Sequence, residues 1–194
     1  TLGSNITLFG DGPGNTTIIA KAATNFENVI YASNQSGFAI ENITVDANQA
    51  NRIASLTTRT NCINLETCTS SVVRNVQVQH SLGFGALVGI GCSVGGVSST
   101  VTFENCRAVD CGTAAKPSDG FFMGASYSLI SNCIASNCTD TGFAMESTNY
   151  SGIVGCVSNG CGAGAAITNA VNNDTFGNYI NGLTVKDWNS PVTG

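Results

Sequence analysis

Residues 104–111 read ENCRAVDC, residues 131–138 read SNCIASNC, and residues 154–161 read VGCVSNGC. Each phrase places a small apolar residue directly after an Asn or Gly, and related phrases return along the whole chain. The apolar residue stands at Ile6, Ile43, Val76, Cys106, Cys133, Cys156 and Leu183, with steps of 37, 33, 30, 27, 23 and 27 residues. A drifting period of this size predicts stacked supersecondary units rather than one globular core.

Alternation within each phrase puts its small apolar residue and the second residue after it on one face of a short strand. The inward pairs predicted in this way are Ile43 and Val45, Val76 and Val78, Cys106 and Ala108, Cys133 and Ala135, Cys156 and Ser158, and Leu183 and Val185. A third apolar stretch follows a Gly-rich turn, as in DGFFMG from Asp119 and TGFAME from Thr141. The glycine-rich residues 89–100 are interpreted as an extended turn.

Three short strands per repeat, with no helix, predict an all-β fold, a single-stranded right-handed parallel β-helix of six to seven coils. We expect residues 1–194 to form one such domain, as a piece of a longer β-helix. Successive coils of a β-helix pair in parallel, so that like residues stack about 4.8 Å apart.

The composition excludes several classes of partner. The chain has a net charge of −5 and only seven Lys and Arg residues, whereas nucleic-acid binding needs clustered positive charge. No apolar run reaches about eighteen residues, so no membrane insertion is expected. His80 is the only His and the Cys spacing does not match a zinc motif, so we expect no metal and no cofactor.

Nine cysteines would ordinarily suggest a disulfide scaffold. Six of them instead fall into two repeat columns, Cys106, Cys133 and Cys156 in one and Cys111, Cys138 and Cys161 in the other. Parallel side chains on neighbouring coils hold their Cβ atoms about 4.8 Å apart, beyond the usual disulfide range. Free buried thiols that pack as small hydrophobes are therefore favoured over disulfides.

Acidic residues in the Gly-rich turns are the first candidates for chemistry. Hydrolysis of a glycosidic bond needs two carboxyl groups, one protonated and one ionised, about 5 to 9.5 Å apart. Asp119 and Asp140 precede equivalent strands on adjacent coils, and Glu146 lies just beyond the second of these strands. The alternative is that both aspartates cap backbone N–H groups in ordinary turns.

A second candidate group comes from the column four residues after the inward Val or Cys. Its members are His80, Asp110, Asn137, Gly160 and Asp187. We expect His80 and Asp110 to face each other across one rung, as a base held by a carboxylate. The alternative is a hydrogen bond between them that merely closes a turn. Elimination from a uronic acid would instead need cations, for which Arg107 and Lys116 are the nearby candidates.

The opening of the chain carries a family resemblance. Residues 6–20 read ITLFGDGPGNTTIIA and residues 38–51 read FAIENITVDANQAN. They resemble the pectate-lyase-like superfamily, in particular the branch of bacteriophage tailspikes and polysaccharide-degrading β-helices. The matching positions are Leu8, Gly10, Gly12, Thr16 and Ile18 in the first stretch, and Val45, Asp46 and Asn48 in the second.

The resemblance implies a polysaccharide or glycan ligand, glycoside hydrolase or polysaccharide lyase activity, an extracellular or virion-surface location and assembly as a homotrimer. It transfers no catalytic residues, because the motif set of polygalacturonases is absent. Our leading interpretation is a carbohydrate-binding, polysaccharide-degrading β-helix with a groove between residues 110–120 and 138–146. The alternative is a non-catalytic structural or adhesive β-helix of a virion fibre or cell surface.

Overall fold

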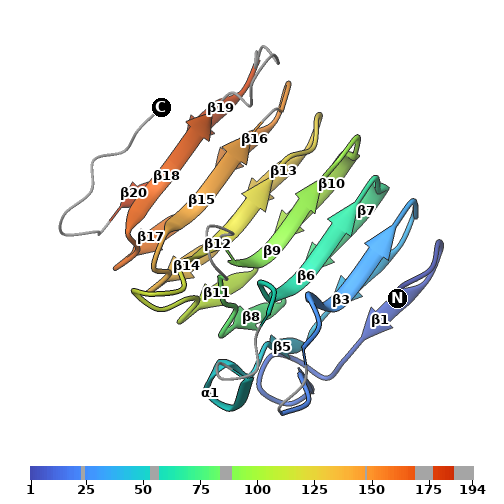
Figure 1. Cartoon of the computed structure of the whole chain (residues 1–194). Helices are drawn as coiled ribbons and strands as arrows, with labels where there is room; N and C mark the ends of the chain where they lie inside the picture. The colour runs from blue at the N-terminus through green and yellow to red at the C-terminus, as the bar shows by residue number, and fades with distance from the viewer. Residues whose placement is uncertain (23–24, 53–56, 84–88, 147, 169–176, 186–194) are drawn as a thin grey trace.

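The computed structural model describes residues 1–22, 25–52, 57–83, 89–146, 148–168 and 177–185, and Figure 1 shows them as a single stack of coils. Within these residues twenty β-strands and one short helix follow one another. The strands form three sheets, A, B and C, in which neighbouring strands come from successive coils and run parallel. The predicted all-β parallel solenoid is confirmed.

Each coil contributes one strand to each sheet. Sheet A contains β1 (Thr7–Phe9), β4 (Ala39–Glu41), β7 (Thr69–Arg74), β10 (Ser99–Glu104), β13 (Leu129–Ser131), β16 (Gly152–Val154) and β19 (Tyr179–Asn181). Sheet B contains β2 (Thr17–Ile19), β5 (Thr44–Asp46), β8 (Gln77–Gln79), β11 (Arg107–Val109), β14 (Ile134–Ser136), β17 (Val157–Asn159) and β20 (Thr184–Val185). Sheet C contains β3 (Asn28–Ser33), β6 (Asn61–Glu66), β9 (Gly89–Gly95), β12 (Ser118–Met123), β15 (Thr141–Glu146) and β18 (Ala163–Thr168).

The number of turns is slightly smaller than the repeat suggested. Sheet C has six described strands, so the chain makes five full turns between β3 and β18. The expected six to seven coils also count the two ends of the stack. There β1 and β2 precede the first strand of sheet C, and β19 and β20 follow its last described strand.

The core consists of columns of like residues. On sheet A, Ile40, Val73, Phe103 and Ile130 stand in register on successive coils, and all four are fully buried. Five of the six predicted inward pairs are buried, namely Ile43 and Val45, Val76 and Val78, Cys106 and Ala108, Cys133 and Ala135, and Cys156 and Ser158. Leu183 packs on the core only partly, because it lies on the last described coil.

In the repeat phrases from residue 41 onward, the Asn or Gly forms a corner between sheets A and B. Asn5 of the first phrase instead precedes β1, which pairs with β4, so Ile6 lies outside the buried column of Ile43. Asn42, Asn75, Asn105 and Asn132 all have positive φ, and Gly155 and Gly182 take the same place on later coils. Asn and Gly are the residues that adopt this left-handed conformation most easily. A second such corner, between sheets B and C, contains Asn48, His80, Asp110, Asn137 and Gly160. Asp187, expected in this column, lies outside the described residues.

Replacing a corner Asn should therefore have a measurable cost. We expect Asn132→Ala to lower the free energy of unfolding by about 1 kcal/mol, because Ala is strained at positive φ. Asn132→Gly should stay within roughly 0.5 kcal/mol of the wild type, since Gly adopts this φ freely. Urea denaturation checks both, with Ser131→Ala on the adjoining strand as the control. Equal losses for the Ala and Gly variants would contradict the corner role.

The cysteine interpretation is confirmed, since all nine cysteines are buried free thiols. In the column of Cys106, Cys133 and Cys156, hydrogen bonds join the sulfur atoms to the backbone of neighbouring coils. The N–H of Cys106 donates to Sγ of Cys133 at 3.4 Å, and the N–H of Cys133 donates to Sγ of Cys156 at the same distance. The thiol of Cys133 in turn donates to the carbonyl of Ser131 at 3.3 Å. The thiol column thus satisfies backbone groups at the buried side of the corner between sheets A and B.

Two local expectations were wrong. Helix α1 (Gln49–Arg52) interrupts the second coil between β5 and β6, although no helix was expected, because one helical turn is too short to produce a periodic pattern. Residues 89–100 contain strand β9 rather than only a turn. Gly91 is required there because a Cβ atom would lie 2.6 Å from the carbonyl oxygen of Gly120 on the neighbouring strand.

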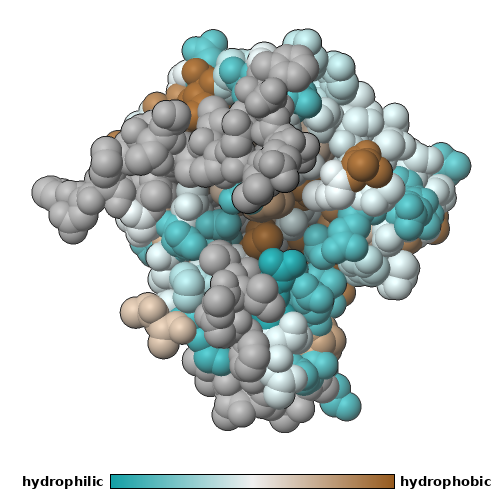
Figure 2. Space-filling model, turned by 45° about the horizontal axis from the view of Figure 1, so that its top comes forward, coloured by the Kyte–Doolittle hydropathy of each residue, from teal (hydrophilic) through white to brown (hydrophobic). Residues whose placement is uncertain are grey.

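One face of the molecule exposes only small apolar areas (Figure 2). Figure 2 shows a face that is mostly hydrophilic to intermediate, with hydrophobic surface in small separate spots. Among the described residues no helix has the length and hydrophobicity needed to cross a membrane.

Candidate functional site

A groove of about 730 Å³ lies on the outer face of sheet C. Its floor is a row of side chains across four neighbouring strands, formed by Asn64, Ser93, Phe122 and Ala144 in register. Alternation explains the row, because the residues on either side of each point into the core. A groove of this volume is in the usual range for small-molecule and oligomer sites, about 300 to 1,000 Å³.

The three acids predicted from the Gly-rich turns all line this groove. Asp119 lies near the start of β12, while Asp140 and Glu146 flank and end β15 on the next coil. The N–H of Thr141 donates to Oδ1 of Asp119 at 2.9 Å, and the N–H of Asp140 donates to the carbonyl of Ser118 at 3.1 Å. Parallel pairing of adjacent coils therefore brings the two aspartates to one end of the groove, as their repeat position predicted.

Asp119 is the acid with the most unusual environment. Only 8% of its surface is exposed. Burial raises the pKa of Asp119 to about 7, the N–H of Thr141 opposes the rise, and the carboxylates of Asp140 and Glu146 add to it. Near neutral pH a large share of Asp119 is therefore protonated while it lies beside carboxylates. This is the arrangement that an acid catalyst needs.

The raised pKa also makes a prediction about stability. The folded protein holds the Asp119 proton up to pH about 7, whereas the unfolded chain releases it near pH 3.9, so stability falls as the pH rises between these values. Asp119→Asn removes the buried charge and keeps the acceptor for Thr141. We expect it to raise the free energy of unfolding by roughly 2 to 4 kcal/mol at pH 8 and by little at pH 4.

Urea denaturation at both pH values checks this prediction. Asp11→Asn, an exposed carboxyl in the loop between β1 and β2, is the matched control and should show no such difference. A gain at pH 8 that does not shrink toward pH 4 would show that Asp119 is not protonated in the folded protein.

The sequence argument missed the opposite end of the groove, where Glu66 ends β6. The hydroxyl of Tyr31 donates to Oε2 of Glu66 at 2.7 Å, and Nδ2 of Asn64 donates to Oε1 at 3.1 Å. A signal for Glu66 was present, because it occupies the same place in its strand as Glu146. Alternation along β12 likewise places Phe121 in the core and Phe122 outward in the groove.

The groove has one cationic side chain among its described lining residues. This is Arg59, whose Nε donates to Oε1 of Glu27 at 3.0 Å. Arg107 and Lys116, the cations considered for elimination, do not line the groove. The charge balance of the described lining is thus strongly negative.

His80 and Asp110 stack on neighbouring coils, but their side chains bond other partners, so the expected pair of base and carboxylate was wrong. Nδ1 of His80 lies 3.0 Å from Oδ1 of Asp46 on the preceding coil. Asp110 instead accepts a hydrogen bond from Nδ2 of Asn137 on the following coil, at 2.9 Å. Residues of one corner column stack along the solenoid axis, so each side chain can turn toward either neighbouring coil. The sequence did not reveal which direction each one takes.

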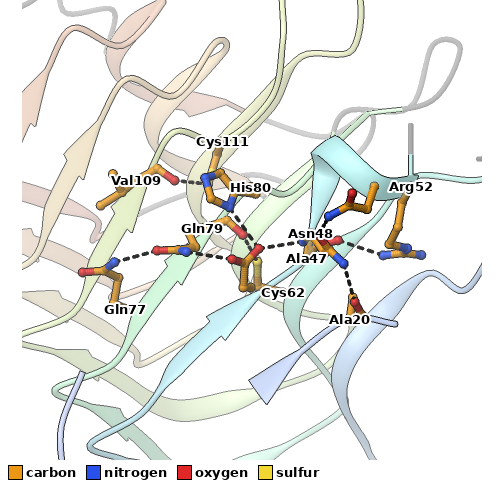
Figure 3. A network of polar contacts seen from close by, with 12 residues as sticks. Ala20, Ala47, Asn48, Arg52, Cys62, Gln77, Gln79, His80, Val109 and Cys111 are labelled. Carbon is orange, nitrogen blue, oxygen red and sulfur yellow. Dashed lines mark hydrogen bonds and ion pairs between the residues drawn. The ribbon is translucent and has the colours of Figure 1, made fainter. Parts of the chain in front are cut away.

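The partner of His80 is fixed by a polar network. Oδ2 of Asp46 accepts from Nε2 of Gln79 at 2.8 Å, and Oδ1 accepts from the N–H of Asn48 at 2.6 Å. Figure 3 shows Gln79, His80 and Asn48 close together at this corner. A small pocket of about 160 Å³ borders Asp46, Asn48 and His80. Neither His80 nor Asp110 lines the groove on sheet C. The predicted residues therefore divide into three groove acids and two residues of the corner between sheets B and C.

The described residues contain no group of three or more His, Cys, Asp or Glu side chains arranged to hold a metal ion.

Known structures share this architecture. The A-module of the mannuronan C-5 epimerase AlgE6 from Azotobacter vinelandii aligns with a TM-score of 0.80 and 19% identity over 95% of this chain and 52% of the module. The catalytic domain of a GH87 α-1,3-glucanase in complex with tetrasaccharides aligns with a TM-score of 0.57 and 22% identity. The alignment covers 91% of this chain and 32% of the glucanase domain. A putative glycosyl hydrolase from Parabacteroides merdae aligns with a TM-score of 0.52 and 15% identity. The alignment covers 95% of this chain and 75% of the hydrolase chain.

At these identities the likeness establishes the fold alone, and the chain spans about half the length of the epimerase module. No curated protein matches the sequence. The family model described as "Right handed beta helix region" matches residues 28–193, which is most of the chain. This match agrees with the superfamily that the opening motif implied, and the chain belongs to the right-handed β-helix family.

Proposed function

We propose that this β-helix binds a polysaccharide in the groove on sheet C and hydrolyses its glycosidic bonds. The observation that carries the proposal is the meeting of Asp119, Asp140 and Glu146 in one groove, with the pKa of Asp119 raised to about 7. A protonated carboxyl beside an ionised one is what glycoside hydrolysis requires. The names of similar structures, which include an α-1,3-glucanase and a putative glycosyl hydrolase, support a glycan ligand.

The roles follow from the environments of the two aspartates. Asp119 is buried and is the general acid that donates its proton to the leaving glycosidic oxygen. Asp140 is more exposed and is the ionised partner, which either activates a water molecule or attacks the sugar carbon directly. Glu146 adds negative charge at the groove, which favours the protonated form of Asp119 and the positive charge that develops on the sugar.

Product analysis over a panel of glycans tests the proposal. A reducing-sugar assay detects hydrolysis, and ultraviolet absorbance detects the unsaturated sugars that a lyase releases. We expect reducing ends without new absorbance from at least one glycan. Absorbance growth would establish a lyase instead, and silence in both assays over the panel would favour the non-catalytic structural or adhesive β-helix.

The setting of the protein is also proposed from the resemblance of residues 6–51. We propose a phage tailspike or a secreted enzyme, placed on a virion surface or outside the cell, and assembled as a homotrimer. Light scattering coupled to size-exclusion chromatography measures the assembly, with a mass of about three chains expected. A monomer at all concentrations would contradict the trimer without affecting the groove.

A further inference from the structure

We propose that the groove on sheet C selects an uncharged polysaccharide and repels polyuronates, and that Glu66 and Glu146 are the residues that set this preference. The inference rests on the proposed glycan-binding function of the groove and adds the substrate class. It is carried by the charges that line the groove, by the positions of the two glutamates and by the contacts that fix one of them.

Four carboxyl groups and one guanidinium line the described part of the groove. The carboxyls belong to Glu66, Asp119, Asp140 and Glu146, and the guanidinium belongs to Arg59, which is paired with Glu27. Protonation of Asp119 near neutral pH leaves three carboxylates facing the ligand. A polymer with a carboxylate on every sugar would place like charges opposite them, and such contacts strongly disfavour a partner.

The two glutamates mark opposite ends of one lateral row. Glu66 ends β6 and Glu146 ends β15, three strands apart in sheet C, so their backbones are separated by about 14 Å. The equivalent places between them are taken by Gly95 at the end of β9 and Gly124 directly after β12. A Cβ atom on Gly95 would meet nothing within 4 Å, so the row is open there.

A glycan chain can therefore cross the groove rim between two carboxylates. The hydroxyl groups of a neutral sugar can donate hydrogen bonds to these oxygens, and bonds to a charged acceptor are stronger than neutral ones. A uronate would instead present its own carboxylate to the same oxygens. The carboxylates of Glu66 and Glu146 thus favour ligands that donate hydroxyl groups and disfavour anionic ligands.

Glu66 cannot easily turn away from an approaching anion, because both of its carboxylate oxygens are engaged. Tyr31 holds one and Asn64, itself only 4% exposed, holds the other. Phe122, half buried in the floor between the two glutamates, offers an apolar surface on which a sugar ring can pack. Both the floor and the rim of the groove therefore favour an uncharged sugar.

Binding measurements on the Asp119→Asn chain test the inference without turnover. The probes are soluble neutral glucans with different linkages, polygalacturonate and alginate, each examined by affinity electrophoresis at low salt and at about 0.5 M salt. At low salt we expect the neutral glucan with the highest affinity to bind at least about tenfold more tightly than either polyuronate. The ratio of the two affinities should become smaller at high salt, because salt screens the repulsion between carboxylates.

Charge removal identifies the responsible residues. In the same background, Glu66→Gln with Glu146→Gln should raise polyuronate affinity by about tenfold. It should also weaken neutral glucan binding, because sugar hydroxyls lose two charged acceptors, so the preference for glucan over polyuronate should fall by at least about tenfold. Glu104→Gln, which removes a carboxylate at the end of β10 outside the groove, is the matched control and should change neither affinity. Circular dichroism confirms that each variant is folded.

The outcomes separate the inference from the proposed hydrolysis. Tighter binding of a polyuronate than of every neutral glucan, an unchanged polyuronate affinity in the double variant, or no binding to any probe would overturn the inference. Neutral glucan binding without cleavage by the wild type would overturn hydrolysis and leave the substrate preference standing. Hydrolysis of a polyuronate by the wild type, seen as new reducing ends without new ultraviolet absorbance, would overturn the substrate preference and leave hydrolysis standing.

Discussion

Asp119→Asn is expected to lower the rate of glycan hydrolysis by about 10² to 10⁴-fold. The amide keeps the shape of the side chain and the acceptor for the N–H of Thr141, but it has no proton to give to the leaving oxygen. The loss should appear in kcat more than in KM, since proton transfer belongs to the transition state rather than to the bound ground state. Initial rates of reducing-sugar release provide the measurement.

Two comparisons make this result specific. Asp140→Asn should also lose at least about 10²-fold, because it removes the ionised partner. Asp11→Asn, far along the chain in an exposed loop, should keep its rate within about twofold. The expected gain in stability of Asp119→Asn at pH 8 would show that the inactive protein is folded. Wild-type rates in both the Asp119 and Asp140 variants would contradict the assignment of these two residues as the catalytic carboxyl groups.

Phe121→Ala is expected to cost about 3 to 5 kcal/mol in the free energy of unfolding. Phe121 is fully buried at the centre of the stack, where its ring lies 5.2 Å from that of Phe143 with an interplanar angle of 4°. The ring of Phe103 also packs against that of Phe121, with 6.2 Å between the two ring centroids. Removing the ring opens a cavity between coils that parallel pairing holds in place.

Urea denaturation followed by circular dichroism measures this loss. Phe122→Ala is the matched control, because the next side chain along β12 points outward into the groove and should cost less than about 1.5 kcal/mol. If Phe121→Ala fails to fold, Phe121→Leu supplies a milder change of about 1 to 1.5 kcal/mol. Equal costs for the two alanine variants would contradict the inward and outward assignment of these neighbours.

Much of the fold was predictable because a solenoid repeats its constraints. The position after each corner Asn is inward on every coil, so Cys106, Cys133 and Cys156 could be placed in one column without coordinates. The positive φ at that position explains why it holds Asn on some coils and Gly on others. Helix α1 escaped prediction because a single turn inserted between strands leaves no repeating signal.

The site was predictable only in part, for related reasons. Asp119 and Asp140 share a repeat position, and parallel pairing of adjacent coils then brings them into one groove. Glu66 lines the same groove from β6, two strands from Asp119 and three from Asp140, and recognising it requires knowing that the outer face of sheet C forms a groove. The choice of Asp46 rather than Asp110 by His80 depends on side-chain rotation, which the repeat pattern does not encode.

The pH dependence of kcat/KM on a neutral glycan that the protein cleaves tests the central claim most directly. This constant reports the ionisation of the free enzyme, in which Asp119 has a pKa of about 7. The account predicts that kcat/KM falls as the pH rises through about 7, approaching tenfold per pH unit, because only protonated Asp119 is active. Activity that stays constant to pH about 9 would contradict the assignment of Asp119 as the acid.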